Sequence, residues 1–107
     1  MTKVETIKLG DKSYPFYVGL NALRFYKQET GVDLLPKLNS GFQLESEVIV
    51  GLTFAGIKEG LRRQNKPMKL KFEDVADLLD DNFDMIGEIF ELLMKFPMFA
   101  GGGQKGK

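Results

Sequence analysis

The chain has 107 residues, 43% apolar and 28% charged, which is ordinary for one soluble intracellular domain. Its fifteen basic and fifteen acidic residues cancel, so no overall field favours nucleic acid or an anionic membrane. The absence of cysteine and histidine argues against disulfides, thiolate metal sites and cofactors, and no apolar run approaches the ~20 residues of a membrane span.

Two short β-rich runs, Lys3 to Leu9 and Ser13 to Val18, flank the turn Gly10-Asp11-Lys12. A Gly-Asp turn between such runs predicts a β-hairpin. Pro15 cannot donate to a ladder, so its strand should lie at an edge. A lone hairpin is marginal in water, so we expect it to pack on helices of the same chain, with a sheet shared between subunits as the alternative.

Residues 20–30 predict a short amphipathic helix, with Asn21 as its N-cap and Gly31 as the residue that ends it. Its apolar stripe consists of Ala22, Leu23, Phe25, Tyr26 and Thr30. From residue 32 to 43, Pro36 and Ser40-Gly41 predict an irregular connection with one helical turn at Leu34 to Leu38.

A helix is expected from Glu47 to Gln64, ending before Pro67, and it is apolar on both sides. One side carries Val50, Phe54, Ile57 and Leu61, and the other carries Val48, Ile49, Leu52 and Ala55. Such a helix must be covered on both sides, so we place it at the centre of the fold. Gly51, Gly56 and Gly60 predict close approach of a neighbouring backbone, because each costs about 1 kcal/mol in a helix interior.

Two further helices are predicted over residues 72–81 and 83–96, with Asn82 capping the second and Pro97 ending it. The core-facing residues would be Val75, Leu78 and Leu79 in the first helix, and Phe83, Ile86, Phe90 and Leu93, joined by Ile89 and Met94, in the second. The fold class is therefore α+β, mainly α, with an N-terminal β-hairpin packed on three to four helices. We expect one domain over residues 1–96 and a flexible Gly/Lys-rich tail over residues 97–107.

The charges are segregated along the chain. A basic block contains Lys58, Arg62, Arg63, Lys66, Lys69 and Lys71, and the acidic block that follows contains Glu73, Asp74, Asp77, Asp80, Asp81, Asp84, Glu88 and Glu91. Because the net charge is zero, we expect these blocks to pair within the chain or between subunits. Lys58, Arg62 and Lys66 share one helical face, so a small nucleic-acid-binding or regulatory protein is the alternative function.

The acidic block also invites a calcium or a catalytic interpretation. Counting Asp80 as the first position of an EF-hand loop places carboxylates at several ligand positions, but Met85 occupies the sixth, which requires glycine. Asp80 and Asp81 have no nearby nucleophile or phosphate-binding loop in the sequence. We therefore predict no catalytic, cofactor or metal site and a protein that is not an enzyme.

Partner binding is the remaining class of function. Phe96, Met98 and Phe99 straddle Pro97 beyond the last regular stripe, where apolar side chains are harder to bury. We expect these three residues to contact a partner, with packing under the helices as the alternative, and one exposed face of the central helix to contribute as well. That face would carry Val50, Phe54, Ile57 and Leu61.

Three segments carry a resemblance to a known family: IKLGDKSYPFYVGLNALRFYKQETG, LTFAGIKEGLRRQ and KLKFEDVADLLDDNFDMIGEIFELL. Their order resembles the tail assembly chaperones of long-tailed bacteriophages, and it covers roughly residues 3 to 95. The resemblance implies a helical protein of the host bacterial cytoplasm that self-associates and binds the tape measure protein before the tail tube polymerises. It also implies that the protein is absent from the mature virion.

The family resemblance further implies a minor, longer form made by a −1 ribosomal frameshift, which could reach the major tail protein. Lys105-Gly106-Lys107 can be encoded as AAG GGA AAA, which contains the slippery heptamer G GGA AAA. A Gly-rich end is equally an ordinary flexible tail or a cloning remnant.

Overall fold

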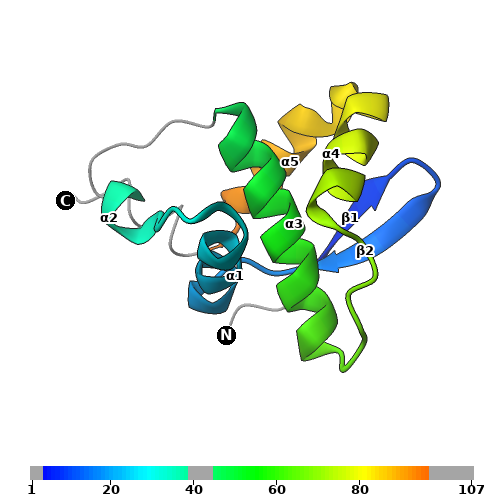
Figure 1. Cartoon of the computed structure of the whole chain (residues 1–107). Coiled ribbons are helices and arrows are strands. Elements are labelled where there is room, and N and C mark those ends of the chain that lie inside the picture. Colours follow the sequence, from blue (N-terminus) through cyan, green and yellow to red (C-terminus); the bar gives the residue numbers. More distant parts are fainter. Residues whose placement is uncertain (1–3, 39–44, 97–107) are drawn as a thin grey trace.

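The computed structural model describes residues 4–38 and 45–96. Its elements in order are β1 (Glu5–Leu9), β2 (Lys12–Phe16), α1 (Leu20–Thr30), α2 (Leu35–Leu38), α3 (Ser46–Arg63), α4 (Phe72–Asp81), the 3₁₀ helix η1 (Phe83–Met85) and α5 (Ile86–Leu93). The predicted class, α+β and mainly α with an N-terminal hairpin, is confirmed (Figure 1). The predicted tail, residues 97–107, lies outside the described residues.

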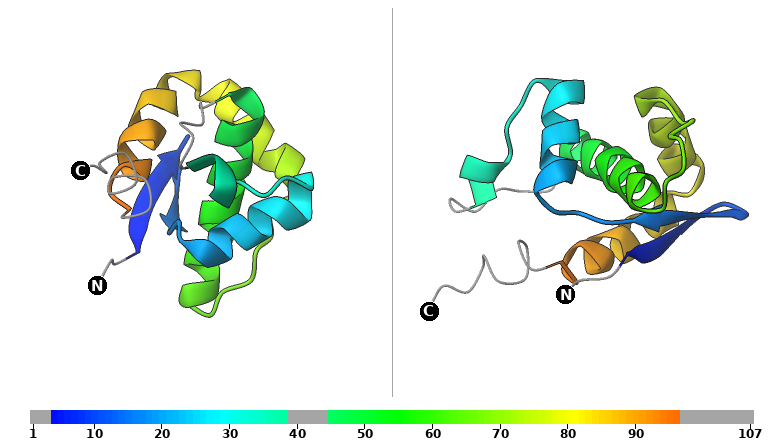
Figure 2. Two further views of the ribbon diagram at one scale, coloured as in Figure 1. Left: turned by 90° about the vertical axis from the view of Figure 1, so that its left-hand side faces the viewer. Right: turned by 90° about the horizontal axis from the view of Figure 1, so that it is seen from below.

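The hairpin turns over two residues, because Leu9 pairs with Lys12 across the antiparallel ladder. Gly10 has a φ of 69°, as the first central residue of a type II′ turn requires. Both strands turn apolar side chains inward, and Ile7, Leu9 and Phe16 are buried. β2 packs on α3 and β1 packs on α5. The hairpin is therefore covered within the chain, between these two helices (Figure 2, right).

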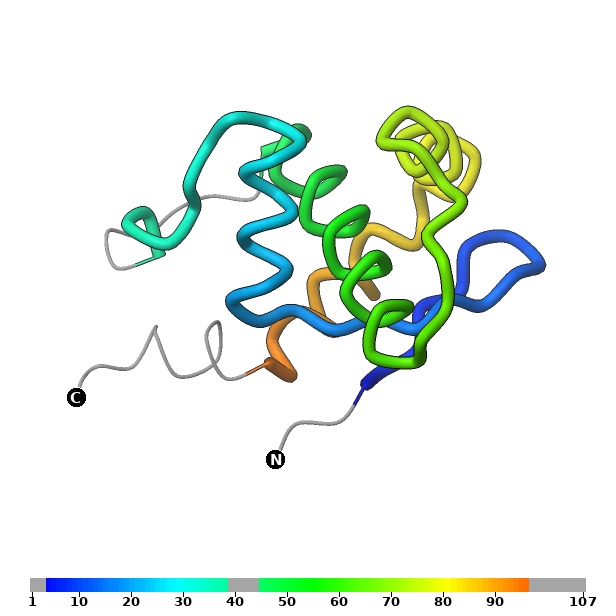
Figure 3. The backbone as a smooth tube through the Cα atoms, turned by 60° about the horizontal axis from the view of Figure 1, so that its bottom comes forward, coloured from blue at the N-terminus to red at the C-terminus, as the bar shows by residue number. Residues whose placement is uncertain are grey.

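Helix α3 is the centre of the fold, as its two apolar sides predict. Every residue from Gly51 to Ile57 is buried, so no side of the helix is open to water over these two turns. α1, β2 and α4 all pack on it. Figure 3 shows α1 along one side of α3 and α4 along the other.

The glycines of α3 sit where neighbouring elements approach most closely. A Cβ on Gly60 would lie 2.5 Å from the carbonyl carbon of Pro15, so the backbone of β2 touches the helix there. A Cβ on Gly56 would meet the ring of Phe16, and the Gly56 oxygen accepts a hydrogen bond of 3.0 Å from the Tyr17 N–H. At Gly51 the close neighbour is the ring of Tyr26. The predicted approach of a backbone thus holds at Gly60 and Gly56, whereas at Gly51 an aromatic ring takes its place.

The helix-ending signals were more reliable than the predicted N-caps. Gly31 ends α1 with a φ of 82° and donates its N–H to the Lys27 oxygen at 2.7 Å. Asn21, however, is not an N-cap, because α1 begins one residue earlier, after Gly19. Asn82 does not cap a following helix with its side chain either. Its Nδ2 donates to the Leu78 oxygen at 2.9 Å and so satisfies a carbonyl at the end of α4.

The last helix differs most from the prediction. Its first three residues form the 3₁₀ helix η1, and α5 ends at Leu93 rather than at residue 96. Within this segment Ile89, Leu93 and Phe96 are buried, whereas the exposed large side chains are Phe83, Phe90 and Met94.

Candidate partner-binding surface

The structure separates the seven predicted contact residues into three groups. Phe54, Ile57 and Phe96 are buried, Val50 and Leu61 are half-buried, and Met98 and Phe99 lie outside the described residues. Phe96 is fully buried, with its ring 5.9 Å from that of Phe16 and 5.4 Å from that of Tyr17. The proposed surface role of Phe96 is therefore corrected: its ring fills the space between the hairpin and α5. Phe54 and Ile57 are likewise core residues.

Large apolar side chains are exposed along η1 and α5 instead. Phe83 is 73% exposed, Phe90 is 47% exposed and Met94 is 41% exposed, with Ile86 partly buried between them. Their spacing of three or four residues places them on one side of the segment. We call Phe83, Ile86, Phe90 and Met94 the apolar stripe. The adjoining side of α5 packs on the core, through Ile89 and Leu93.

The stripe continues into a groove between the N-terminal end of α3 and the pair formed by α4 and η1. The groove has a volume of about 300 Å³. Its lining consists of Ser46, Ile49, Val50, Ala76, Leu79, Asp80, Phe83 and Ile86. Small side chains at Ser46 and Ala76 leave the space open, and most of the other residues are apolar. Of the predicted contact residues, Val50 lines this groove.

Sequence reasoning could not find this groove, because it depends on the helical phase of η1 and α5. If Phe83 and Phe90 faced the core, as the stripe of phenylalanines predicts, the outer surface would be polar. The signal that was available is the pair of competing apolar stripes in residues 83–96, one of which must stay uncovered.

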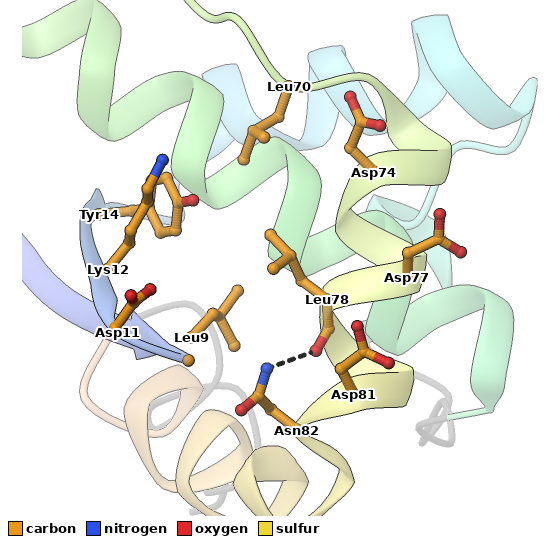
Figure 4. Close-up of a pocket in the computed structure, with 11 residues that line it drawn as sticks. Leu9, Asp11, Lys12, Tyr14, Leu70, Asp74, Asp77, Leu78, Asp81 and Asn82 are labelled. Atoms are coloured by element: carbon orange, nitrogen blue, oxygen red, sulfur yellow. Dashed lines mark hydrogen bonds between the residues drawn. The ribbon is translucent and has the colours of Figure 1, made fainter.

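A second, larger hollow of about 620 Å³ lies between the hairpin turn and α4 (Figure 4). Leu9, Leu70 and Leu78 line its apolar part. Its acidic residues are Asp11, from the turn, and Asp74, Asp77 and Asp81, from α4. Figure 4 shows the three α4 carboxylates spread along the helix rather than converging on one point. In the part of the chain that the structure describes, no three acidic side chains are grouped as metal ligands.

The buried carboxylate of Glu59 holds the basic end of α3 in place. Arg62 donates to it through Nε at 2.6 Å and through Nη2 at 2.8 Å, and Arg63 Nε donates at 2.8 Å. Burial raises the pKa of Glu59, but the hydrogen bonds from both guanidinium groups outweigh it and hold the pKa below its ordinary value of 4.5. The guanidinium carbon of Arg63 also lies 3.8 Å from the centre of the Tyr17 ring.

These contacts reduce the basic face that the nucleic-acid alternative requires. Arg62 is engaged by Glu59, and the Lys58 ammonium lies 4.6 Å from the centre of the Phe25 ring. Among residues 4–38 and 45–96, Lys66 has no acidic partner. Among these residues, no ion pair joins the basic block to the acidic block. Arg62 and Arg63 pair instead with Glu59 of their own helix. Pairing between subunits stays a prediction.

Comparison with protein-family models, with curated proteins and with solved structures finds no match for this chain. None of the helices in the described ranges has both the length and the apolar character that crossing a membrane requires. The resemblance to tail assembly chaperones therefore stays a prediction from the sequence, and the case for a function depends on the surface itself.

Proposed function

We propose that this chain is a non-enzymatic tail assembly chaperone that associates with itself and binds helices of a tape measure protein. The observation that carries the proposal is the uncovered apolar surface formed by the groove and the apolar stripe. A continuous apolar surface on a small chain is typical of a site that binds another protein. A groove between helices is also a recurrent way of binding an amphipathic helix.

In this proposal the groove covers apolar helix faces that would otherwise aggregate. The rings of Phe83 and Phe90 project far enough to pack between side chains of a bound helix. One groove of this size would bind weakly and reversibly. Self-association would place several grooves along one long partner, and linked weak sites raise the overall affinity by 10²–10⁴-fold, roughly, without any new contact.

The proposal includes the setting that the family resemblance implies. The chaperone acts in the bacterial cytoplasm during assembly and leaves before the virion is complete. A longer form made by frameshifting would connect it to the major tail protein. Reading the gene through codon 107 tests this part: a G GGA AAA heptamer with an open −1 frame supports it, and a sequence that cannot slip removes it.

Co-expression with the tape measure protein tests the proposal as a whole. We expect the tape measure protein to stay in solution and to co-purify with the wild-type chain. A variant with Phe83→Ser and Phe90→Ser should lose this ability while keeping its helical circular dichroism, because both side chains are exposed. The matched control carries Leu20→Ser and Leu35→Ser, which remove exposed leucines from α1 and α2. Equal solubilisation by all three proteins would refute the proposal.

A further inference from the structure

In the elements that form one wall of the groove, every charged residue is acidic. Residues 72–94, which span α4, η1 and α5, contain eight acidic residues and no lysine or arginine. The whole chain is neutral, so this wall is a local excess of negative charge on a molecule without net charge. A charge distribution of this kind steers and selects partners rather than simply raising affinity.

Three of these carboxylates border the groove. Asp80 lines the groove itself. Glu73 lies three and seven positions before Ala76 and Asp80, hence on the same side of α4. The third, Asp84, directly follows Phe83, which lines the groove. All three are exposed.

These carboxylates lack counter-ions in the chain as far as it is described. Within residues 4–38 and 45–96, no ion pair involves Glu73, Asp80 or Asp84. Three of the chain's own cations are engaged elsewhere: Arg62 and Arg63 bind Glu59, and the Lys95 ammonium lies 3.8 Å from the Glu5 carboxylate. The border of the groove therefore remains available to cations from another molecule.

The length of the apolar surface suits a helix. From Phe83 to Met94 the apolar stripe spans twelve residues, and the eleven steps between them cover roughly 17 Å at a rise of 1.5 Å per residue. That length matches about three turns of a helix lying along it. A helix that fills such a groove presents apolar residues at three- and four-residue spacing and places its flanking side chains over the border.

We propose that the groove selects amphipathic helices whose apolar face is bordered by lysine and arginine. This inference rests on the proposed function and names the chemical class of helix that the chaperone binds. Apolar anchors enter the groove beside Val50 and Phe83, and the flanking cations meet carboxylates such as Asp80 and Glu73. An acidic border disfavours a helix with Glu or Asp flanks by like-charge repulsion.

Two fluorescent 18-residue peptides with the same Leu/Ile face test this inference, one with lysine flanks and one with glutamate flanks. In fluorescence anisotropy with the intact chain at low salt, we expect the lysine peptide to bind at least tenfold more tightly. Its affinity should fall as salt rises from 50 to 300 mM, because exposed charges about a Debye length apart are screened. Equal binding of the two peptides, or tighter binding of the glutamate peptide, would overturn the inference.

Matched variants show whether the border causes the preference. The variant with Glu73→Gln and Asp80→Asn should lose most of the preference while still binding both peptides weakly. The control variant, with Asp11→Asn and Glu29→Gln, removes the same charge from the hairpin turn and α1 and should behave as wild type. An unchanged preference in the first variant, or an equal loss in the control, would contradict the assignment to this border.

The alternative occupant is a second copy of this chain. If neither peptide binds, and Phe83→Ser with Phe90→Ser changes the sedimentation of the chain alone, a second copy fills the groove and the inference is wrong. Failure of this inference is distinguishable from failure of the proposed function. A chain that keeps the tape measure protein in solution but does not prefer lysine flanks retains the function and loses only the charge selection.

Discussion

Gly60→Ala should destabilise the protein although alanine is the better helix former. Gly60 lies in α3, where exchanging glycine for alanine gains about 1 kcal/mol from helix propensity alone. The new Cβ would, however, lie 2.5 Å from the Pro15 carbonyl carbon and 2.6 Å from the Phe16 nitrogen. These contacts are with backbone atoms, which cannot rotate away as the end of a flexible side chain could.

Relief would require the hairpin to move off α3. Overpacking a filled core costs about 1–3 kcal/mol, and a contact between two backbones belongs at the upper end of that range. Subtracting the propensity gain leaves a net loss of about 2 kcal/mol in the free energy of unfolding. For a chain of this size, that loss lowers the melting temperature by roughly 10 °C. Urea denaturation monitored by circular dichroism measures it directly.

Gly87→Ala is the matched control for this prediction. Gly87 also lies in a helix, α5, but a Cβ there would meet nothing within 4 Å. Because Gly87 is in the first turn, we expect part of the propensity gain, about 0.5 kcal/mol of added stability. The same substitution should therefore have opposite signs at the two positions. A Gly60→Ala protein as stable as wild type would show that the strand has room to shift and would refute the reasoning.

Three other predictions follow from the contacts described above. Phe96→Ala should cost about 3–5 kcal/mol of stability in urea denaturation because the ring is fully buried, whereas Phe90→Ala should change it by less than about 1 kcal/mol. Glu59 has a lowered folded-state pKa, so it stabilises the fold above its unfolded-state pKa and stops doing so as the pH falls through the folded value. The stability difference between wild type and Glu59→Gln should therefore shrink below pH 4.5; a constant difference would count against the Arg62 and Arg63 contacts. A low-salt gel-shift assay with duplex DNA or RNA should show no complex, and a salt-sensitive complex that Lys66→Glu abolishes would favour the nucleic-acid alternative.

The elements that sequence reasoning placed correctly have strong local signals. α3 is apolar around almost its whole circumference over two turns, and only a central position satisfies that pattern. Gly31 and the Gly10 turn succeeded because their backbone conformations require glycine, with φ values of 82° and 69°. For α4 the predicted bounds, residues 72–81, agree with the structure.

The surface was less predictable because it depends on helical phase and on tertiary packing. In residues 83–96 two apolar stripes compete, and tertiary packing buries Ile89 and Leu93 while Phe83 and Phe90 stay exposed. Phe96 follows α5 and was therefore expected at the surface, yet the hairpin supplies Phe16 and Tyr17 to cover it. Local periodicity contains no information about that contact, which joins residues eighty positions apart in the chain.

Hydrogen–deuterium exchange on the chain, alone and with a helical segment of the tape measure protein, tests the central claim most directly. If the groove and the apolar stripe bind the segment, amide exchange should slow in the first turn of α3 and across η1 and α5, residues 83–93. Exchange in α1 should not change. Protection confined to α1 or to the connection at residues 64–71, with none in α5, would contradict the account.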